Sequence, residues 1–456
     1  MTPVGQDEPV ATPPSDPSTP IGSLVDADPA ATTGAVAHPT AADPERGHHA
    51  ELTAGTGLEG TGFSPGTGPA DGADPAESAT DAADKAGASS SALFGRGMLY
   101  VVVSSLQLLT GALASPILAH LLGDPAEFGR LSSAIALHQL LIVVAIVGLD
   151  QAIVLKRSED GHDGNVRALA STSIMLATAV TALLWLTAGW WAPLFGFDAG
   201  SQLALITVLW TIPSAGVMVQ LALLLTADRL KPYAVVSVLA AVGGQVAGIV
   251  AVLIFGRQAA IYAWGLLGAD LVAAVIGWSL TRPTLKRAFS WSLLKPSLAL
   301  GTPLMFGALS MFVLNAGDRI IIQRELGPAE VGRYQVAYTV GFVAVQMIGL
   351  TSKAWTPRFA AIRDRTLRWQ IIGSSRDSIY ALLSPVVLGI ILAAPLLLRI
   401  VAPSSFRPET LLMVTLLVLI GAYPVAASGA SSRMLITSRR ARPLATWMAI
   451  AATVNV

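Results

Sequence analysis

The chain has 456 residues, of which 53% are hydrophobic and only 13% are charged, with a mean hydropathy of +0.61. Soluble globular domains carry about 25% charged residues, so this composition excludes an ordinary soluble enzyme. The formal net charge of 0 excludes a basic nucleic-acid-binding protein, and the absence of cysteine excludes disulfides and thiolate chemistry. The composition is that of a membrane protein that crosses the bilayer several times.

Residues 1–92 are predicted to form a disordered, acidic tail in the cytoplasm. They contain 14 acidic and 2 basic side chains, 12 prolines and a single aromatic residue, Phe63. Such a segment cannot bury enough apolar surface to offset the entropy lost on ordering. No apolar stretch follows Met1, so the tail does not have the pattern of a secretory signal.

The rest of the chain is a series of long apolar stretches. A bilayer core about 30 Å thick requires roughly 20 residues of helix. Ten complete stretches satisfy this, and an eleventh begins at Pro443. They lie near 98–118, 131–155, 168–190, 202–226, 233–255, 259–281, 298–322, 331–351, 377–400 and 411–430. Since backbone polar groups in lipid must be paired within a helix, the predicted fold class is an all-α polytopic membrane protein.

Basic side chains are distributed unequally between alternate loops. With a cytoplasmic N-terminus, the inner loops carry 19 Lys and Arg side chains and the outer side carries 7. The positive-inside rule therefore predicts this orientation in the plasma membrane. The outer loops are short, so we expect no extracellular catalytic domain, no catalytic residues and no enzymatic activity.

A short motif occurs twice, once after the first stretch and once after the seventh. Residues 122–130 read LGDPAEFGR and residues 326–333 read LGPAEVGR, which agree at seven of eight positions when one gap is allowed. Six stretches separate the copies, so both halves have the same orientation. The sequence thus predicts two parallel six-helix repeats, related by a pseudo-two-fold axis along the membrane normal.

The repeat divides the chain into an N-terminal lobe, 98–281, and a C-terminal lobe, 298–456. Shifting the fifth and sixth stretches by 204 residues places their counterparts near 437–459 and 463–485. The second lobe is therefore expected to be incomplete in this sequence, with helices 7 to part of 11.

Together with the segment Asp318-Arg319-Ile-Ile-Ile that leads into Leu326-Gly327-Pro328, this repeated turn resembles polysaccharide-biosynthesis flippases. These belong to the multidrug/oligosaccharidyl-lipid/polysaccharide exporter superfamily. The resemblance implies two six-helix lobes that close alternately around a central cavity. It also implies the partners: a polyprenyl-diphosphate-linked oligosaccharide, the lipid bilayer and other polysaccharide assembly proteins, but no nucleic acid.

Placing a charged side chain inside the bilayer costs free energy, so such residues are candidates for a functional or structural role. Asp270 lies deepest, in the middle of the sixth stretch, where it is either a site for H⁺ or Na⁺, an acceptor for sugar hydroxyls, or a neutral acid hydrogen-bonded between helices. Asp318 and Arg319, with Asn315 one turn away, either face the cavity to hold a phosphate or acidic sugar, or lie at the membrane interface.

Two further polar residues are candidates for ion coupling. Asp150 lies near the inner end of the second stretch, where an anchoring role at the interface is favoured over coupling. His138 in the same stretch titrates near neutral pH when unperturbed, although a hydrogen bond between helices is favoured for it. No metal site is predicted.

The leading hypothesis is a transporter that flips lipid-linked oligosaccharide or polysaccharide precursors from the cytoplasmic to the outer leaflet by alternating access. The alternative is an ion-coupled multidrug or small-molecule antiporter of the same fold. The sequence contains no G-x-x-x-x-G-K-[ST] loop for a nucleotide. We therefore expect no cofactor, and transport coupled to H⁺ or Na⁺ or driven by the substrate gradient.

Overall fold

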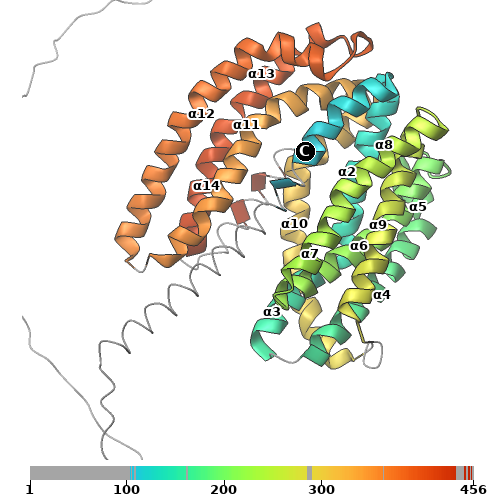
Figure 1. Ribbon diagram of the computed structural model, residues 1–456, viewed down its shortest axis with the longest axis vertical. Coiled ribbons are helices and arrows are strands. Elements are labelled where there is room, and N and C mark those ends of the chain that lie inside the picture. The colour runs from blue at the N-terminus through green and yellow to red at the C-terminus, as the bar shows by residue number, and fades with distance from the viewer. Residues whose placement is uncertain are drawn as a thin grey trace, which may run out of the picture. The chain divides into compact units, whose positions relative to one another are not determined.

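The computed structural model describes residues 103, 105–106, 109–160, 163–284, 290–362 and 364–437, and a few isolated residues after them. Every regular element in these ranges is a helix (Figure 1), which confirms the predicted all-α class. The predicted tail, 1–92, and most of the eleventh stretch, from Pro443, lie outside the described residues.

The helices follow the predicted order. The N-terminal lobe contains α2 (Pro125–Ile146), α3 (Leu149–Asp160), α4 (Asp163–Leu186), α5 (Ala188–Trp191), η1 (Ala192–Phe195), α6 (Gln202–Thr226), α7 (Leu230–Val238), η2 (Leu239–Gly243), α8 (Gly244–Phe255) and α9 (Ala259–Thr281). The C-terminal lobe contains α10 (Trp291–Glu325), α11 (Pro328–Ala361), α12 (Arg365–Val401), η4 (Ser404–Phe406), η5 (Pro408–Thr410), α13 (Leu412–Ile420) and α14 (Ala422–Thr437).

Eight helical segments within the described ranges are long and apolar enough to cross a membrane, and a shorter apolar helix spans Leu109–Leu122. The chain is a multi-pass membrane protein. Helix α11, which covers the predicted stretch 331–351, is not among the eight. Several helices run well past the apolar stretches, with 35 residues in α10 and 37 in α12, because helical hydrogen bonding continues beyond the hydrocarbon layer.

Local signals in the sequence explain where α2 begins and ends. Asp124 is its N-cap, accepting a hydrogen bond from the backbone N–H of Ala126 at 2.9 Å, and Pro125 occupies the first turn. The predicted stretch 131–155 is interrupted at Val147 and Gly148, whose φ angles are 53° and 68°. This left-handed pair separates α2 from α3.

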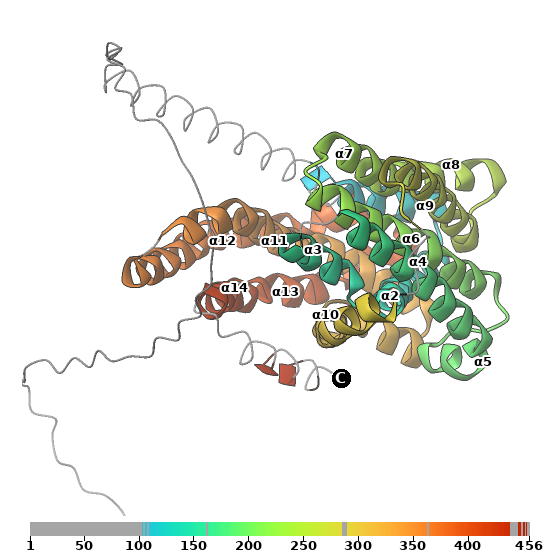
Figure 2. The ribbon, with the colours of Figure 1, turned by 90° about the horizontal axis from the view of Figure 1, so that it is seen from below.

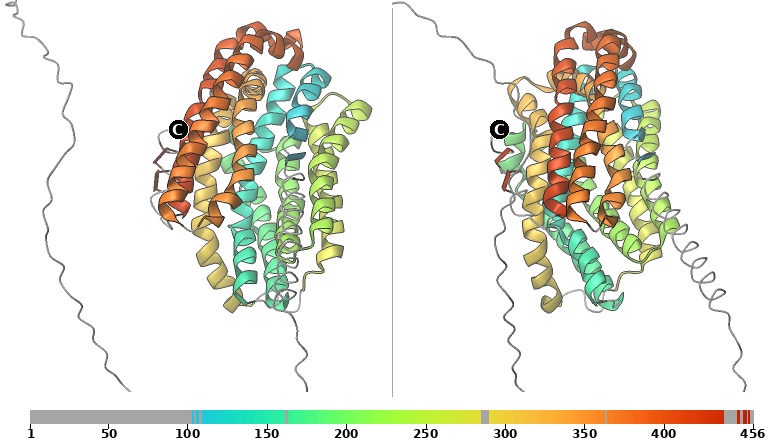
Figure 3. Two further views of the ribbon diagram at one scale, coloured as in Figure 1. Left: turned by 60° about the vertical axis from the view of Figure 1, so that its left-hand side comes forward. Right: turned by 90° about the vertical axis from the view of Figure 1, so that its left-hand side faces the viewer.

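Helices from the first half of the chain pack against one another, and so do helices from the second half. Helix α6 packs against α2, α4 and α9, and α9 in turn packs against α8. In the second half, α11 packs against α12 and α13, while α14 contacts α12 (Figures 1 and 2). The long helices run side by side in broadly one direction (Figure 3), as expected for a bundle that crosses a bilayer.

The two copies of the repeated motif meet where α2 crosses α11, the most extensive contact between elements in the described chain. A Cβ atom on Gly129 would lie 1.7 Å from the carbonyl oxygen of Pro328, and one on Gly332 would lie 2.0 Å from that of Pro125. The contacts are reciprocal, as a pseudo-two-fold axis between the two helices requires. Only glycine permits backbones to approach this closely.

The glutamate of the first motif copy ties α2 to another helix of its own lobe. Glu127 accepts a hydrogen bond from the backbone N–H of Ala259 at 2.7 Å, at the N-terminus of α9. It also forms an ion pair with Arg130, one turn along α2. One short motif therefore supplies the cap of α2, its crossing point with α11 and a partner for the first turn of α9.

Substitution of Gly129 by alanine is expected to separate α2 from α11 and lower the free energy of unfolding by about 2 kcal/mol. The matched control is Gly349→Ala on α11, where a Cβ meets nothing within 4 Å. There the helix should gain up to about 1 kcal/mol. Thermal unfolding of the detergent-solubilised chain measures both, and equal effects of the two variants would contradict the close crossing.

Candidate functional site

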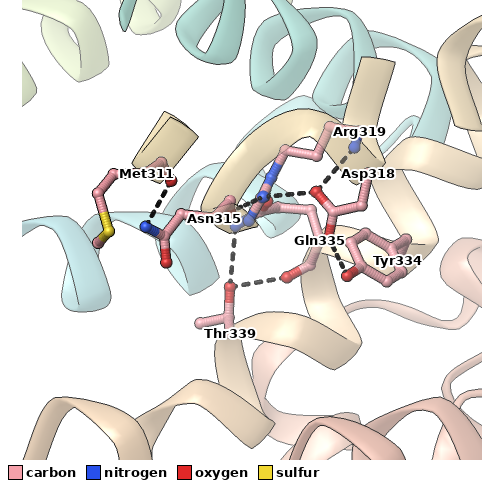
Figure 4. A network of polar contacts seen from close by, with 7 residues as sticks. All are labelled: Met311, Asn315, Asp318, Arg319, Tyr334, Gln335 and Thr339. Atoms are coloured by element: carbon pink, nitrogen blue, oxygen red, sulfur yellow. Dashed lines mark hydrogen bonds and ion pairs between the residues drawn. The ribbon is translucent and has the colours of Figure 1, made fainter. Parts of the chain in front are cut away.

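An ion pair between adjacent residues forms the centre of a polar network on α10 (Figure 4). A guanidinium nitrogen of Arg319 lies 3.1 Å from a carboxylate oxygen of Asp318, and the backbone N–H of Arg319 donates to the same oxygen at 2.8 Å. Tyr334 on α11 donates its hydroxyl to the other carboxylate oxygen. The charges of the two side chains therefore compensate each other.

Arg319 is also held by uncharged groups of both helices. Its Nε donates to the side-chain oxygen of Gln335 at 2.7 Å, and a terminal nitrogen donates to the backbone oxygen of Asn315 at 3.0 Å. The guanidinium carbon lies 4.4 Å from the ring centre of Tyr338, within cation–π range. With only 8% of its surface exposed, Arg319 is fixed in place and does not extend toward the membrane surface.

This network forms one wall of a cavity between the lobes. The cavity has a volume of about 290 Å³ and is bounded by α2 on one side and by α10 and α11 on the other. Its lining residues are Ser132, Ile135, Ala136, Gln139, Asn315, Ala316, Arg319, Gln335, Tyr338 and Phe342. Amide, hydroxyl and aromatic groups dominate, and the single cation in this lining is already paired.

Aromatic side chains recur every four residues on α11 beside the cavity. The rings of Tyr334 and Tyr338 lie 5.9 Å apart, and those of Tyr338 and Phe342 are stacked at 4.9 Å. Residues four apart lie on the same face of a helix. Tyr338 and Phe342 thereby present adjacent aromatic surfaces to the cavity.

A second polar cluster lies inside the N-terminal lobe, between α2, α6 and α9. One carboxylate oxygen of Asp270 accepts hydrogen bonds from the hydroxyl of Ser214 at 2.5 Å and from the indole N–H of Trp210 at 2.8 Å. Ser214 also lies 3.1 Å from Nε2 of His138, whose ring stacks on Trp210 with centroids 3.5 Å apart. Nδ1 of His138 is buried and has no hydrogen-bond partner among the described atoms.

A family model described as polysaccharide biosynthesis protein matches residues 117–409. The chain belongs to this family. The match covers both motif copies, the cavity and the Asp270 cluster. No curated protein sequence matches the chain.

Solved structures with the same fold are membrane transporters. The inward-facing conformation of a multidrug resistance MATE family transporter of the MOP superfamily aligns with 76% of this chain and 84% of its own, with a TM-score of 0.56 and 16% identity. The outward-facing conformation of such a transporter aligns with 78% and 84%, with a TM-score of 0.51 and 17% identity. This member of the polysaccharide biosynthesis family therefore shares its fold with these transporters.

The fold brings together most of the polar residues singled out in the sequence. Asn315, Asp318 and Arg319 share the cavity network, whereas Asp270 and His138 share the cluster of the N-terminal lobe. Asp150 belongs to neither, since its hydrogen bond in the described structure comes from the neighbouring Gln151. Within the described residues, no group of three or more His, Asp or Glu side chains could hold a metal ion.

Sequence reasoning missed the uncharged partners in both places. Trp210 and Ser214 are four residues apart on α6, a spacing that indicates one face of a helix but not which acid it meets. Tyr334, Tyr338 and Phe342 also repeat every four residues and could have been recognised as an aromatic face. Gln335 carries no such signal, because its partner Arg319 is on another helix.

The ion pair on α10 should respond differently to single and double substitution. Arg319→Gln leaves a carboxylate without its cation, and Asp318→Asn leaves the guanidinium without its anion, so we expect each single change to lower the unfolding free energy by about 3 kcal/mol. Asp318→Asn combined with Arg319→Gln removes both charges and should cost less than the sum of the single changes. Denaturant unfolding of the wild type, the two single variants and the double variant in detergent measures the coupling.

A matched pair on the same helix is the control. Arg324 and Glu325 are 3.5 Å apart, with 59% and 66% of their side chains exposed. Arg324→Gln should change stability by no more than about 0.5 kcal/mol. Additive effects of the Asp318 and Arg319 substitutions would contradict a coupled network.

Proposed function

We propose that this chain is a flippase that moves lipid-linked oligosaccharide or polysaccharide precursors from the cytoplasmic to the outer leaflet. The family match and the transporter fold support this function at the level of the whole chain. The observation that carries the proposal is the composition of the cavity between the lobes. Its lining combines amide, hydroxyl and aromatic side chains with apolar ones, its single arginine is paired with Asp318, and it lies among helices long enough to cross a membrane.

These features match the chemistry of a sugar. The apolar C–H face of a sugar ring can lie on the rings of Tyr338 and Phe342, while its hydroxyls exchange hydrogen bonds with amides such as Gln139 and Gln335. A volume of about 290 Å³ accommodates part of a headgroup at a time. The polyprenyl chain of the substrate stays in the bilayer.

Alternating access provides the mechanism. The two lobes are related by the pseudo-two-fold crossing of α2 and α11, so rocking about this contact exposes the cavity first to one side and then to the other. The unequal distribution of Lys and Arg supports a cytoplasmic N-terminus and hence entry from the inner leaflet. Any driving force must favour one of the two states over the other.

Reconstituted vesicles test the proposal directly. The full chain is incorporated with a polyprenyl-diphosphate-linked oligosaccharide, and a membrane-impermeant glycosidase reports how much sugar reaches the outer surface with time. We expect the wild-type chain to accelerate exposure. Tyr338→Leu removes one aromatic surface of the cavity and should slow the process about tenfold.

Phe306→Leu is the control, because Phe306 is 60% exposed on α10 and is not part of the cavity lining. It should retain the wild-type rate. Exposure no faster than in empty vesicles would overturn the flippase, and transport of cationic drugs by the same vesicles would favour an antiporter.

The Asp270 cluster supports ion coupling, in the flippase or in an ion-coupled antiporter of the same fold. The carboxylate is surrounded by neutral donors, and no cationic side chain pairs with it among the described residues. A buried carboxylate in this setting either takes up a proton or binds a cation. We propose that H⁺ or Na⁺ binds at Asp270 and that His138, which contacts Ser214, is part of this ion site.

If Asp270 binds the coupling ion, Asp270→Asn abolishes the dependence of transport on an imposed H⁺ or Na⁺ gradient. Initial rates in vesicles with and without each gradient measure this. Asp198→Asn is the control, since Asp198 is exposed and accepts a hydrogen bond from the backbone of Gly200. Persistent gradient dependence in Asp270→Asn, or none in the wild type, would disprove coupling at this residue.

A further inference from the structure

We propose that a pocket at one end of the N-terminal lobe binds the phosphate group of an anionic lipid. Three arginines from three parts of the chain, Arg157, Arg167 and Arg229, line this pocket. The other lining residues among those that the structure describes are Val166, Leu223, Leu224, Thr226, Ala227 and Thr281, none of which is acidic. The pocket is separate from the cavity between the lobes and shares no residue with it.

The position of the pocket along the helices places it at the depth of lipid headgroups. Its residues come from the end of α3, the second turn of α4, the end of α6 with the loop that follows, and the last residue of α9. All these segments are the ends of membrane-length helices or lie beside them. A pocket formed by such ends faces the boundary between hydrocarbon and water.

The size and the walls of the pocket also fit a lipid phosphate. Its volume is about 50 Å³, and one water-sized group requires roughly 10–15 Å³, so a small tetrahedral anion fits whereas a sugar chain does not. Val166, Leu223 and Leu224 are buried and give the pocket an apolar side. A phosphate attached to an apolar chain satisfies both the arginines and this wall.

The guanidinium groups are suited to this ligand. Arginine presents planar, paired donors that match phosphate oxygens. Arg229 donates one hydrogen bond to the backbone oxygen of Leu280 at 2.6 Å, which fixes the side chain at the end of α9. Arg167 is exposed.

The central cavity does not offer the same chemistry. Arg319 is its only cationic lining residue, and it is bound to Asp318, Gln335 and the backbone of α10. A phosphate there would have to displace these partners. The arginine pocket offers three guanidinium groups, of which that of Arg167 is exposed. We therefore expect the anionic group to bind in this pocket and uncharged groups to bind in the central cavity.

Two lipids carry the required chemistry: a bilayer glycerophospholipid with net negative charge, and the polyprenyl phosphate of a sugar carrier. Binding of either lipid does not depend on flipping. A negative result in the flippase assay therefore does not contradict this lipid site, and a negative result in the lipid-binding assay does not contradict the flippase. The purified full chain in a neutral detergent is titrated with phosphatidylglycerol and, separately, with phosphatidylcholine. Native mass spectrometry measures the fraction bound.

We expect the chain to bind phosphatidylglycerol about tenfold more tightly than phosphatidylcholine. Arg167→Gln should weaken the binding of phosphatidylglycerol about tenfold, as expected for the loss of one charge-assisted hydrogen bond. Arg229→Lys is the second variant, since it keeps the charge but loses the planar fork, and it should weaken binding less. Competition with a polyprenyl phosphate then identifies the source. Displacement of phosphatidylglycerol assigns the pocket to the carrier lipid, and its absence assigns the pocket to the bilayer lipid.

Arg257→Gln is the matched control, because Arg257 is exposed in the loop between α8 and α9 and does not line the pocket. It should bind phosphatidylglycerol within about twofold of the wild type. Equal binding of the two lipids, unchanged affinity in Arg167→Gln, or an equal loss in Arg257→Gln would overturn the site.

Discussion

The close crossing of α2 and α11 is the contact on which the arrangement of the two lobes depends. At Gly129 and Gly332 the backbones themselves touch, and neither position has room for a Cβ atom. The crossing brings α10 and α11 against α2 and thereby determines the width of the cavity beside them. In a bilayer, where apolar surfaces gain little by leaving lipid, such close packing is a principal source of helix association.

The charged side chains inside the helix bundle are each satisfied by neighbouring groups. The ion pair of Asp318 and Arg319 is built into one helix and completed by Gln335 and Tyr334 from the next, so that the cavity wall carries polar groups without net charge. Asp270 is satisfied in a different way, by neutral donors from α6. These two arrangements are the basis for the proposed sugar site in the cavity and the proposed ion site at Asp270.

In the functions proposed above, the central cavity, the Asp270 cluster and the arginine pocket bind chemically different groups. Sugar hydroxyls require amides and aromatic surfaces, a lipid phosphate requires guanidinium groups near water, and a coupling ion requires a shielded carboxylate. Separating these groups avoids placing unpaired arginines within the hydrocarbon layer, where their cost is highest. The proposed substrate has both a sugar part and a lipid phosphate, and these sites would bind the two parts separately.

The sequence by itself determined the all-α class, the order of the helices and the presence of two parallel halves, because the bilayer imposes the length of each apolar stretch and a repeated motif is visible in the letters. It also identified Asp270, Arg319 and Asp318, since an ionisable residue in an apolar stretch stands out. Only the tertiary structure decided what these residues touch. Trp210, Ser214 and Gln335 are ordinary in sequence, and their roles arise from helices far apart in the chain that meet at angles set by packing. The same holds for Gly129 and Gly332, whose motif was recognised as a repeat but whose reciprocal contact exists only when the two halves are folded against each other.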